Sequence, residues 1–218
     1  MSNEMKPSGS IFYRIIKRCF DICFSVLLMI PVGVVLVISW VLIKIDDGGP
    51  LFYYAERAGR FGKVFKMYKI RSMKVGAPDI RLADGSTYNG ADDQRVTRFG
   101  KVARKTSIDE LPQIINVLKG DMSFIGPRPD TPVGLAAYSE EERIILTVRP
   151  GITGYNQVLN RNSVLTKEKL VNDIYYVKHL SLLLDIRIAF ATVFAVLRHK
   201  NINRPNQETD SMKKTDRE

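Results

Sequence analysis

The longest apolar segment of the chain lies near its N-terminus. Residues 22–43 read ICFSVLLMIPVGVVLVISWVLI and contain no charged side chain. This length matches the roughly 20 residues that a helix needs to cross a bilayer. The segment is too long for the apolar part of a signal peptide, and no small-x-small cleavage site follows it. The pattern therefore predicts a membrane helix.

Two topologies fit this helix. Pro31 lies near its middle, where proline kinks or breaks a helix, and the Ser25 hydroxyl is available to the freed backbone groups. Lys and Arg occur on both flanks, although the positive-inside rule places them on the cytoplasmic side. A spanning helix satisfies one flank, whereas a helix–break–helix hairpin that returns to the same leaflet satisfies both. The pattern leaves both topologies open; in the hairpin, Lys17, Arg18 and Asp21 lie at the headgroups.

Alternating apolar and basic residues predict a β-hairpin after the membrane helix. The segment DDGGP, residues 46–50, is typical of a turn. Residues 64–70 alternate aromatic or aliphatic side chains with lysines, and glycines mark a hairpin turn around residues 59–62. The basic face of this hairpin is either solvated or placed against anionic headgroups or a phosphate.

The rest of the pattern predicts helices and irregular segments. Residues 107–119 form a helix that ends at Gly120, with an apolar face made of Leu111, Ile114, Ile115 and Leu118. The other expected features are a long loop over 76–95, an irregular proline-rich segment over 124–132, a polar helix over 139–147, a turn over 149–154, helices over 166–178 and 181–198, and a polar tail from residue 201. The predicted fold class is α+β, mostly helical and membrane-associated, with one small β-hairpin.

The composition adds a strong positive charge. The 218 residues suffice for one domain with a core, and the formal net charge of +10 with a pI of about 9.6 predicts a polyanionic partner. Candidates are nucleic acid, an anionic membrane and a phosphorylated substrate; scarce aromatic–basic clustering outside residues 64–70 argues against nucleic acid. Cys19 and Cys23 imply no disulfide framework, and the isolated His179 and His199 imply no metal cluster.

The segment TSIDELPQ, residues 106–113, places two adjacent carboxylates at a helix start. With Ser107 as the N-cap, Ser107 and Glu110 match a capping box, but Pro112 then falls beyond the first turn. With Asp109 as the N-cap, Pro112 fits the first turn, but the capping box is lost. The local rules therefore do not agree on one start, a conflict that is common at functional sites.

Basic residues around the pair allow a second interpretation. Arg104 precedes the pair, and Arg128 stands between two prolines that restrict its backbone. A helix N-terminus and guanidinium groups bind phosphate oxygens, and one or two carboxylates hold Mg²⁺ together with substrate phosphates. An aspartate also attacks phosphorus to form an acyl phosphate. Asp109 and Glu110 are thus either ordinary helix-start residues or part of a phosphate and metal site.

Longer motifs give these residues a family context. KTSIDELPQIINVLKGDMSFIGPRP, followed by VRPGITGYNQV, closely resembles the bacterial sugar transferase family, specifically the small monotopic phosphoglycosyl transferases. The resemblance runs from RIIKRCFD, which begins at Arg14, through VNDIYYVKHLSLLLDIRIAF, so it covers nearly the whole chain.

The resemblance implies a reaction and roles. The family transfers a sugar phosphate from a nucleotide diphosphate sugar, normally a UDP-sugar, to a polyprenyl phosphate, typically undecaprenyl phosphate, with Mg²⁺ and release of UMP. By position, Asp109 is the nucleophile that forms a covalent phosphosugar–aspartate intermediate. Glu110 helps it to bind Mg²⁺ or handle protons, and Arg104 and Arg128 match phosphate-binding arginines. The product is the polyprenyl diphosphate sugar that begins polysaccharide or glycoconjugate synthesis.

Three more residues lie in family-like motifs and are assigned to the substrate site more loosely: Arg149, Arg161 and Asp173. The triplet NRN, residues 160–162, stands where many relatives have Gly-Arg-Asn. This departure bears on sugar recognition.

The resemblance also favours the hairpin, with a re-entrant helix broken at Pro31 and the active site on the cytoplasmic face of the bacterial cytoplasmic membrane. Inner-leaflet lipids are then partners. The expected organisation is a tail and re-entrant helix over 1–46, a catalytic domain over 47–200 and a tail over 201–218, the minimal form of the family. The sugar, the pathway and the oligomeric state, a dimer included, stay open. The alternative function is a membrane-anchored, non-catalytic binding or scaffold protein.

Overall fold

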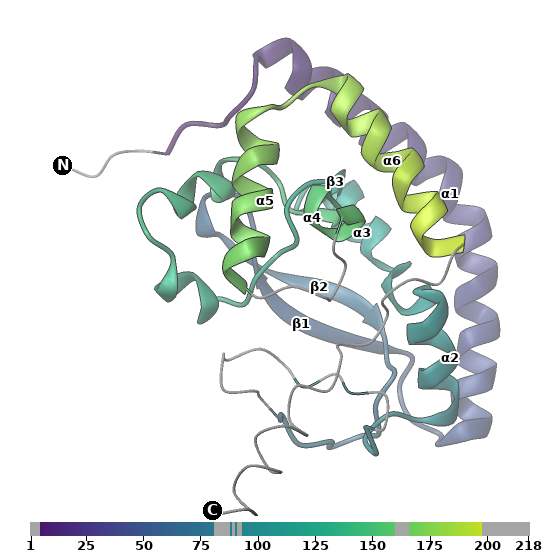
Figure 1. Ribbon diagram of the computed structural model, residues 1–218. Coiled ribbons are helices and arrows are strands. Elements are labelled where there is room, and N and C mark those ends of the chain that lie inside the picture. The colour runs from purple at the N-terminus through teal and green to yellow at the C-terminus, as the bar shows by residue number, and fades with distance from the viewer. Residues whose placement is uncertain (1–4, 81–87, 89, 91–92, 160–165, 198–218) are drawn as a thin grey trace, which may run out of the picture.

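The computed structural model describes residues 5–80, 88, 90, 93–159 and 166–197. A long N-terminal helix runs along one side of a mixed domain of helices and strands (Figure 1). The predicted α+β class is confirmed, since helices predominate and the strands form an antiparallel hairpin and a short parallel pair. Arg161 and the predicted polar tail lie outside the described residues.

Helix α1, Ile11–Asp46, contains the whole apolar segment. Its first turn is capped by Ser10, whose Oγ accepts a hydrogen bond from the backbone N of Tyr13 at 3.1 Å. The helix continues through Pro31, so the predicted break there is wrong. A proline removes one backbone donor, but here the turns on both sides keep helical geometry, and α1 is one curved helix about 54 Å long (Figure 1).

One stripe of α1 packs against the domain. Ser25, Val32 and Ser39 are buried at seven-residue intervals, and Ile43 continues the stripe. The Oγ of Ser25 has no hydrogen-bond partner among the described residues, so the predicted role of this hydroxyl in satisfying freed backbone groups is also wrong. The opposite face exposes apolar side chains that include Leu27, Ile30 and Val37. By length and composition, α1 could cross a membrane.

The predicted β-hairpin is confirmed. Strands β1, Phe52–Ala58, and β2, Val64–Ile70, pair antiparallel, and the short 3₁₀ helix η1, Arg60–Gly62, forms the turn between them. Phe65 and Met67 are buried against Val117 and Met122. Because side chains alternate along a strand, Lys69 projects from the same face as Phe65 and Met67.

Helix α2, Arg98–Thr106, was not predicted. Thr97 caps it by accepting a hydrogen bond from the backbone N of Gly100 at 3.0 Å. A Cβ at position 100 would overlap the carbonyl of Ser72, so the glycine allows α2 to lie directly against the segment that follows β2. This contact places the C-terminal end of α2 beside the hairpin.

The predicted helix over 107–119 is divided in two. A 3₁₀ turn η2, Ile108–Glu110, precedes helix α3, Gln113–Lys119, which ends at Gly120 as predicted. Of the predicted apolar face, only Ile114 is fully buried; the other three side chains are half-buried. Asn116 is buried instead, because its Oδ1 accepts from the backbone N of Tyr68 at 3.0 Å and its Nδ2 donates to the Lys66 carbonyl at 2.8 Å. These bonds hold α3 against β2.

A short parallel pair follows. Strand β3, Ser123–Ile125, pairs with β4, Gly151–Thr153, within segments predicted to be irregular or a turn. Both expectations are wrong here, because Gly126 and Gly151 lack the Cβ atoms that would clash across the pair. The two strands can pair because their backbones approach closely at these glycines. The hydrophobic periodicity of the sequence does not reveal this approach.

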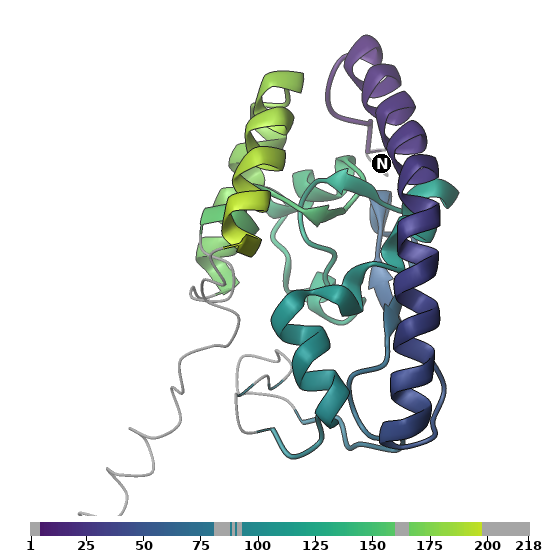
Figure 2. The same ribbon diagram turned by 90° about the vertical axis from the view of Figure 1, so that its right-hand side faces the viewer.

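The C-terminal half packs around a second core of Ile125, Tyr176, Val177 and Ile188. The predicted polar helix is only a 3₁₀ helix η4, Glu142–Thr147, preceded by η3, Gly134–Ala137. Helix α4, Tyr155–Leu159, was not predicted, whereas α5, Thr166–Lys178, and α6, Leu182–Leu197, confirm the two expected helices. Figure 2 shows α6 and α1 on opposite sides of the short strands.

Candidate active site

The acidic pair lies in a sharp connection between α2 and α3. Ser107 ends α2 in the left-handed conformation, with φ of 59°, and its side chain forms no cap bond. Pro112 itself is the N-cap of α3. Both predicted helix starts, at Ser107 and at Asp109, are therefore wrong. Pro112 cannot donate to the Ile108 carbonyl, which instead accepts from the backbone N of Leu111 at 3.1 Å.

This connection buries most of both carboxylate side chains. Their accessible fractions are 12% for Asp109 and 20% for Glu110. A non-glycine residue in the left-handed region costs about 1 kcal/mol or more, and such strain clusters at functional sites. The pair is thus held by a strained turn rather than by a regular helix start.

Lys69 and Arg128 bind the acidic pair. The Nζ of Lys69 lies 3.0 Å from Oε1 of Glu110 and 3.9 Å from Oδ2 of Asp109. Arg128 donates from NH2 to the same Oε1 at 2.7 Å. The structure therefore brings the predicted Arg128 to the pair and adds Lys69, which sequence reasoning did not select. The strand alternation that buries Phe65 and Met67 was the signal for Lys69, but the pattern alone does not say which segment that face meets.

Arg104 completes the group from the end of α2. Its Nε donates to the Ser72 hydroxyl at 3.0 Å, and it lies close enough to act electrostatically on Asp109. Burial lowers the pKa of Arg104, partly offset by Asp109 and Asp93. Four predicted residues, Asp109, Glu110, Arg104 and Arg128, thus share one site.

The two carboxylates differ in acidity. Burial would raise the pKa of Glu110, but Arg128 and Lys69 together outweigh it and hold that pKa well below its usual value. Burial raises the pKa of Asp109, aided by the charge of Glu110 and opposed mainly by Lys69. Adjacent groups with pKa values driven apart in this way are typical of sites where the two members have different roles. Glu110 stays anionic, and Asp109 is the member whose protonation responds to its surroundings.

The other assigned residues lie elsewhere. Arg149 stands at the opposite end of α3 from the pair, where its Nε donates to the Gly120 carbonyl at 2.8 Å. Asp173 is buried in α5, and burial raises its pKa to about 7, with Lys169 opposing. Its charge acts on Tyr138, whose hydroxyl donates to Asp130 at 3.3 Å, two residues beyond Arg128. Asp173 thus approaches the Arg128 segment, but the structure does not place it at the pair.

The donor set suits only a metal that a substrate helps to hold. No group of three or more Asp, Glu, His or Cys side chains gathers within the described part of the chain. Asp109 and Glu110 supply two carboxylates, and Oε1 of Glu110 already accepts from two cations. Mg²⁺ commonly binds through one or two carboxylates with substrate phosphates and water completing its shell. The pair fits that kind of site.

Comparison with known proteins supplies the family. The chain is 39% identical over 196 residues to undecaprenyl-phosphate galactose phosphotransferase of Salmonella typhimurium, covering 85% of this chain and 41% of that protein. It is 37% identical over 188 residues to undecaprenyl-phosphate glucose phosphotransferase of Komagataeibacter xylinus, covering 81% and 35%. It is also 37% identical over 207 residues to the exopolysaccharide production protein ExoY of Sinorhizobium fredii, covering 89% of each.

The chain therefore spans less than half the length of the first two relatives and most of the third. A sequence model described as bacterial sugar transferase matches residues 12–199, which include α1, the hairpin and the acidic pair. With that match extending over most of its length, the chain belongs to the bacterial sugar transferase family of enzymes.

Proposed function

We propose that this enzyme transfers a sugar phosphate from a UDP-sugar to a polyprenyl phosphate, such as undecaprenyl phosphate, and releases UMP. The observation that carries the proposal is the buried Asp109 beside an ionised Glu110, with Lys69, Arg104 and Arg128 around them. The activities for which the Salmonella and Komagataeibacter relatives are named support it. Because their names carry different sugars, galactose and glucose, the sugar itself is left open.

The first step uses Asp109 as the nucleophile. A carboxylate oxygen of Asp109 attacks the sugar-bearing phosphorus, a new O–P bond forms, and the bond to the uridylyl oxygen breaks, so UMP leaves with both electrons of that bond. The product is a phosphosugar–aspartate. Lys69, 3.9 Å from Oδ2, favours the ionised form of Asp109 that this attack requires.

The second step transfers the phosphosugar to the lipid. An oxygen of polyprenyl phosphate attacks the same phosphorus and displaces the Asp109 carboxylate, which yields polyprenyl diphosphate sugar and the free enzyme. Arg128, whose side chain is half exposed, would shift from Glu110 to a substrate phosphate, and Arg104 would add positive charge near Asp109.

Asp109 and Glu110 are the residues that would hold Mg²⁺ together with diphosphate oxygens. When bound, the ion supplies charge neutralisation at the phosphates. Release of Glu110 from Lys69 would then leave that lysine for the substrate.

We also propose that both ends of α1 lie on the cytoplasmic side of the bacterial cytoplasmic membrane, where the catalytic domain faces the cytoplasm. Near the start of α1, Lys17 pairs with Asp185 at 2.6 Å. At its end, Asp46 accepts from the backbone N of Phe99 at 2.9 Å. Both partners, Asp185 and Phe99, follow α1 in the chain, and their contacts with its two ends support a topology in which these ends share one side of the bilayer. This supports a same-leaflet topology without the break at Pro31.

The activity is tested with the full-length chain. Without lipid acceptor, a panel of UDP-sugars with Mg²⁺ should yield UMP and a phosphosugar adduct on Asp109, detected by mass spectrometry. Undecaprenyl phosphate should then discharge the adduct and restore turnover. Asp109→Asn should form no adduct. A variant that turns over at the wild-type rate would refute the mechanism, and no UMP release with any donor would favour the non-catalytic binding or scaffold protein.

The topology has a separate test. Cysteine-reactive or protease-accessible tags at the N-terminus and after Gly48 should both be reached from the cytoplasmic side. Labelling of the two tags from opposite sides would mean that α1 spans the bilayer.

A further inference from the structure

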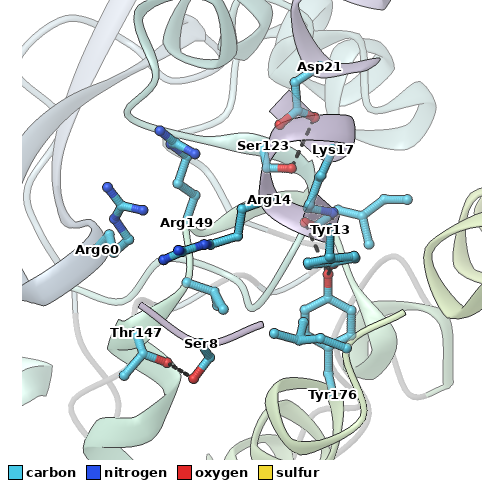
Figure 3. A pocket seen from close by; sticks show the side chains of 13 residues that line it. Ser8, Tyr13, Arg14, Lys17, Asp21, Arg60, Ser123, Thr147, Arg149 and Tyr176 are labelled. Atoms are coloured by element: carbon cyan, nitrogen blue, oxygen red, sulfur yellow. Dashed lines mark hydrogen bonds between the residues drawn. The ribbon is translucent and has the colours of Figure 1, made fainter. Parts of the chain in front are cut away.

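A second group of cations surrounds a small cavity away from the acidic pair. The cavity has a volume of about 30 Å³, and it is lined by Arg14 and Lys17 of α1, Arg60 of the hairpin turn and Arg149. Figure 3 shows the guanidinium groups of Arg14, Arg60 and Arg149 converging on one space. These cations come from three segments that are distant in sequence, so the fold assembles the cluster.

The cluster lies apart from the active site. Arg60 is at the turn of the hairpin, whereas Lys69 is near its open end, about 17 Å further along β2 from Val64 at roughly 3.3 Å per residue. Arg149 is at the C-terminal end of α3, whereas the acidic pair precedes its N-terminal end. An anion held here would not contact Asp109.

Among the described residues, Arg14, Arg60 and Arg149 take part in no ion pair, and the Nε of Arg14 is buried without a hydrogen-bond partner. Lys17 differs, because Asp185 binds it at 2.6 Å. One carboxylate, Asp21, also lines the cavity, but its Oδ1 accepts from the Ser123 hydroxyl and the Phe124 backbone N.

Like charges held together in this way favour a bound anion. Burial lowers the pKa of Arg149, and the charges of Arg60 and Arg18 add to that effect while Asp21 opposes it. Guanidinium groups that converge from several directions match the oxygens of a phosphate group, which accepts charge-assisted hydrogen bonds from more than one arginine.

The surroundings distinguish a lipid phosphate from a soluble one. Arg14 lies about two helical turns before the apolar segment that begins at Ile22. The outward face of the same turns exposes Phe12 and Ile15, at 70% and 55% of their surface. Apolar side chains beside a basic cluster, just before a membrane helix, are the pattern of a group at headgroup depth.

We propose that Arg14, Arg60 and Arg149 form a binding site for the phosphate of an anionic membrane lipid, separate from the catalytic pair. The phosphate occupies the arginine cluster, and the acyl chains enter the bilayer beside the start of α1, where Phe12 and Ile15 are exposed. The site would secure the N-terminal part of α1 and the hairpin turn to the same lipid. It does not depend on the transfer reaction proposed above.

Native mass spectrometry tests the site without any turnover. The full-length chain in neutral detergent is supplied with palmitoyl-oleoyl phosphatidylglycerol or with the zwitterionic phosphatidylcholine of the same chains. We expect phosphatidylglycerol to be retained at least fivefold more than phosphatidylcholine. Arg14→Gln and Arg60→Gln should each reduce its retention about tenfold, since each removes a charge-assisted contact. Arg98→Gln, an exposed arginine on α2, removes the same charge elsewhere and should change nothing.

Several outcomes would overturn the proposal. Equal retention by all variants would show that the lipid binds nonspecifically. Displacement of phosphatidylglycerol by millimolar inorganic phosphate, with no preference between the lipids, would assign the site to a soluble phosphate. Thermal unfolding in detergent establishes that the variants are folded, and because Arg60 lies on a surface turn, Arg60→Gln decides the question if Arg14→Gln does not fold.

Discussion

The cations around Asp109 and those around Arg149 use the same side-chain types in different electrostatic settings. At the acidic pair, Lys69 and Arg128 converge on one oxygen of Glu110. At the other cluster, Arg14, Arg60 and Arg149 face a cavity whose lining, among the described residues, includes one carboxylate, Asp21, which is already hydrogen-bonded. In the first group, two of the three cations bind Glu110 directly, so their charge is partly compensated. In the second group, three arginines share a cavity with one carboxylate and form no ion pair among the described residues, so less of their charge is compensated.

This difference bears on the basic composition of the chain. A formal charge of +10 predicts an anionic partner but does not say where it binds. We propose that one cluster acts on a substrate phosphate and that the other binds a lipid phosphate. Four substitutions, two of them with a matched control, test this comparison between the two clusters.

The largest effect is expected at the nucleophile. Asp109→Asn should lower kcat/KM by about 10³-fold or more, because the amide cannot form the acyl phosphate and only substrate binding remains. Asp121→Asn, at the far end of α3, is the matched control and should stay within about twofold. The measurement is UMP release with saturating polyprenyl phosphate. A loss of similar size in both variants would indicate damage to α3 rather than to the chemistry.

Lys69 is the residue that the structure adds to the site. Lys69→Met should lower kcat/KM roughly 10- to 100-fold at neutral pH, the usual worth of a hydrogen bond to a charged group. Lys66→Met is the control, since Lys66 is exposed on the opposite face of β2. Steady-state kinetics of both variants check the prediction. If the two behave alike, Lys69 acts only through the surface charge of the hairpin.

The pH dependence of kcat/KM tests the contact between Lys69 and Asp109. Burial raises the pKa of Asp109 above its usual value, and the nucleophile must be ionised, so kcat/KM should fall about tenfold per unit as the pH drops below that pKa. Because Lys69 opposes the shift, Lys69→Met should move this acid limb to higher pH, whereas Lys66→Met should leave it in place. An acid limb that does not move would remove Asp109 as the titrating group or Lys69 as its neighbour.

The smallest effects are expected on stability. Substitutions in the two clusters should change the free energy of unfolding in opposite directions. Arg128→Gln removes a half-exposed ion pair and should lower the free energy of unfolding by up to about 1 kcal/mol near neutral pH. Arg60→Gln relieves repulsion and should raise it by roughly a few tenths of a kcal/mol. Thermal unfolding in neutral detergent measures both. Equal signs would mean that the two clusters do not differ as described.

The contribution of Arg128 to the free energy of unfolding should also depend on pH. Arg128 helps to hold the Glu110 pKa below its usual value, so this stabilisation is present above the usual glutamate pKa and is lost as the pH falls through the lowered one. The difference between wild type and Arg128→Gln should therefore shrink in acid. A difference that grows in acid would contradict the assigned pair.

Much of the fold was predictable because its signals are local. The apolar segment, the alternation of the hairpin, the helices α5 and α6 and the stop at Gly120 each depend on neighbours along the chain. Helix α2 and strand β4 were missed because their decisive glycines, Gly100 and Gly151, serve contacts with segments far along the sequence. The prediction of a helix break at Pro31 was wrong for a related reason. A long helix that packs along a domain tolerates the loss of one backbone N–H donor.

The sequence by itself determined the candidate chemistry: two adjacent carboxylates, an arginine between prolines and a motif order that resembles one family. Only the tertiary structure decided the partners of those groups. It joined Lys69 to the pair, placed Arg149 at the other end of α3 and gathered Arg14 and Arg60 beside it. The physical reason is that a side chain's type is set by its own position, whereas its charge state and contacts depend on which distant segments folding brings within a few ångströms.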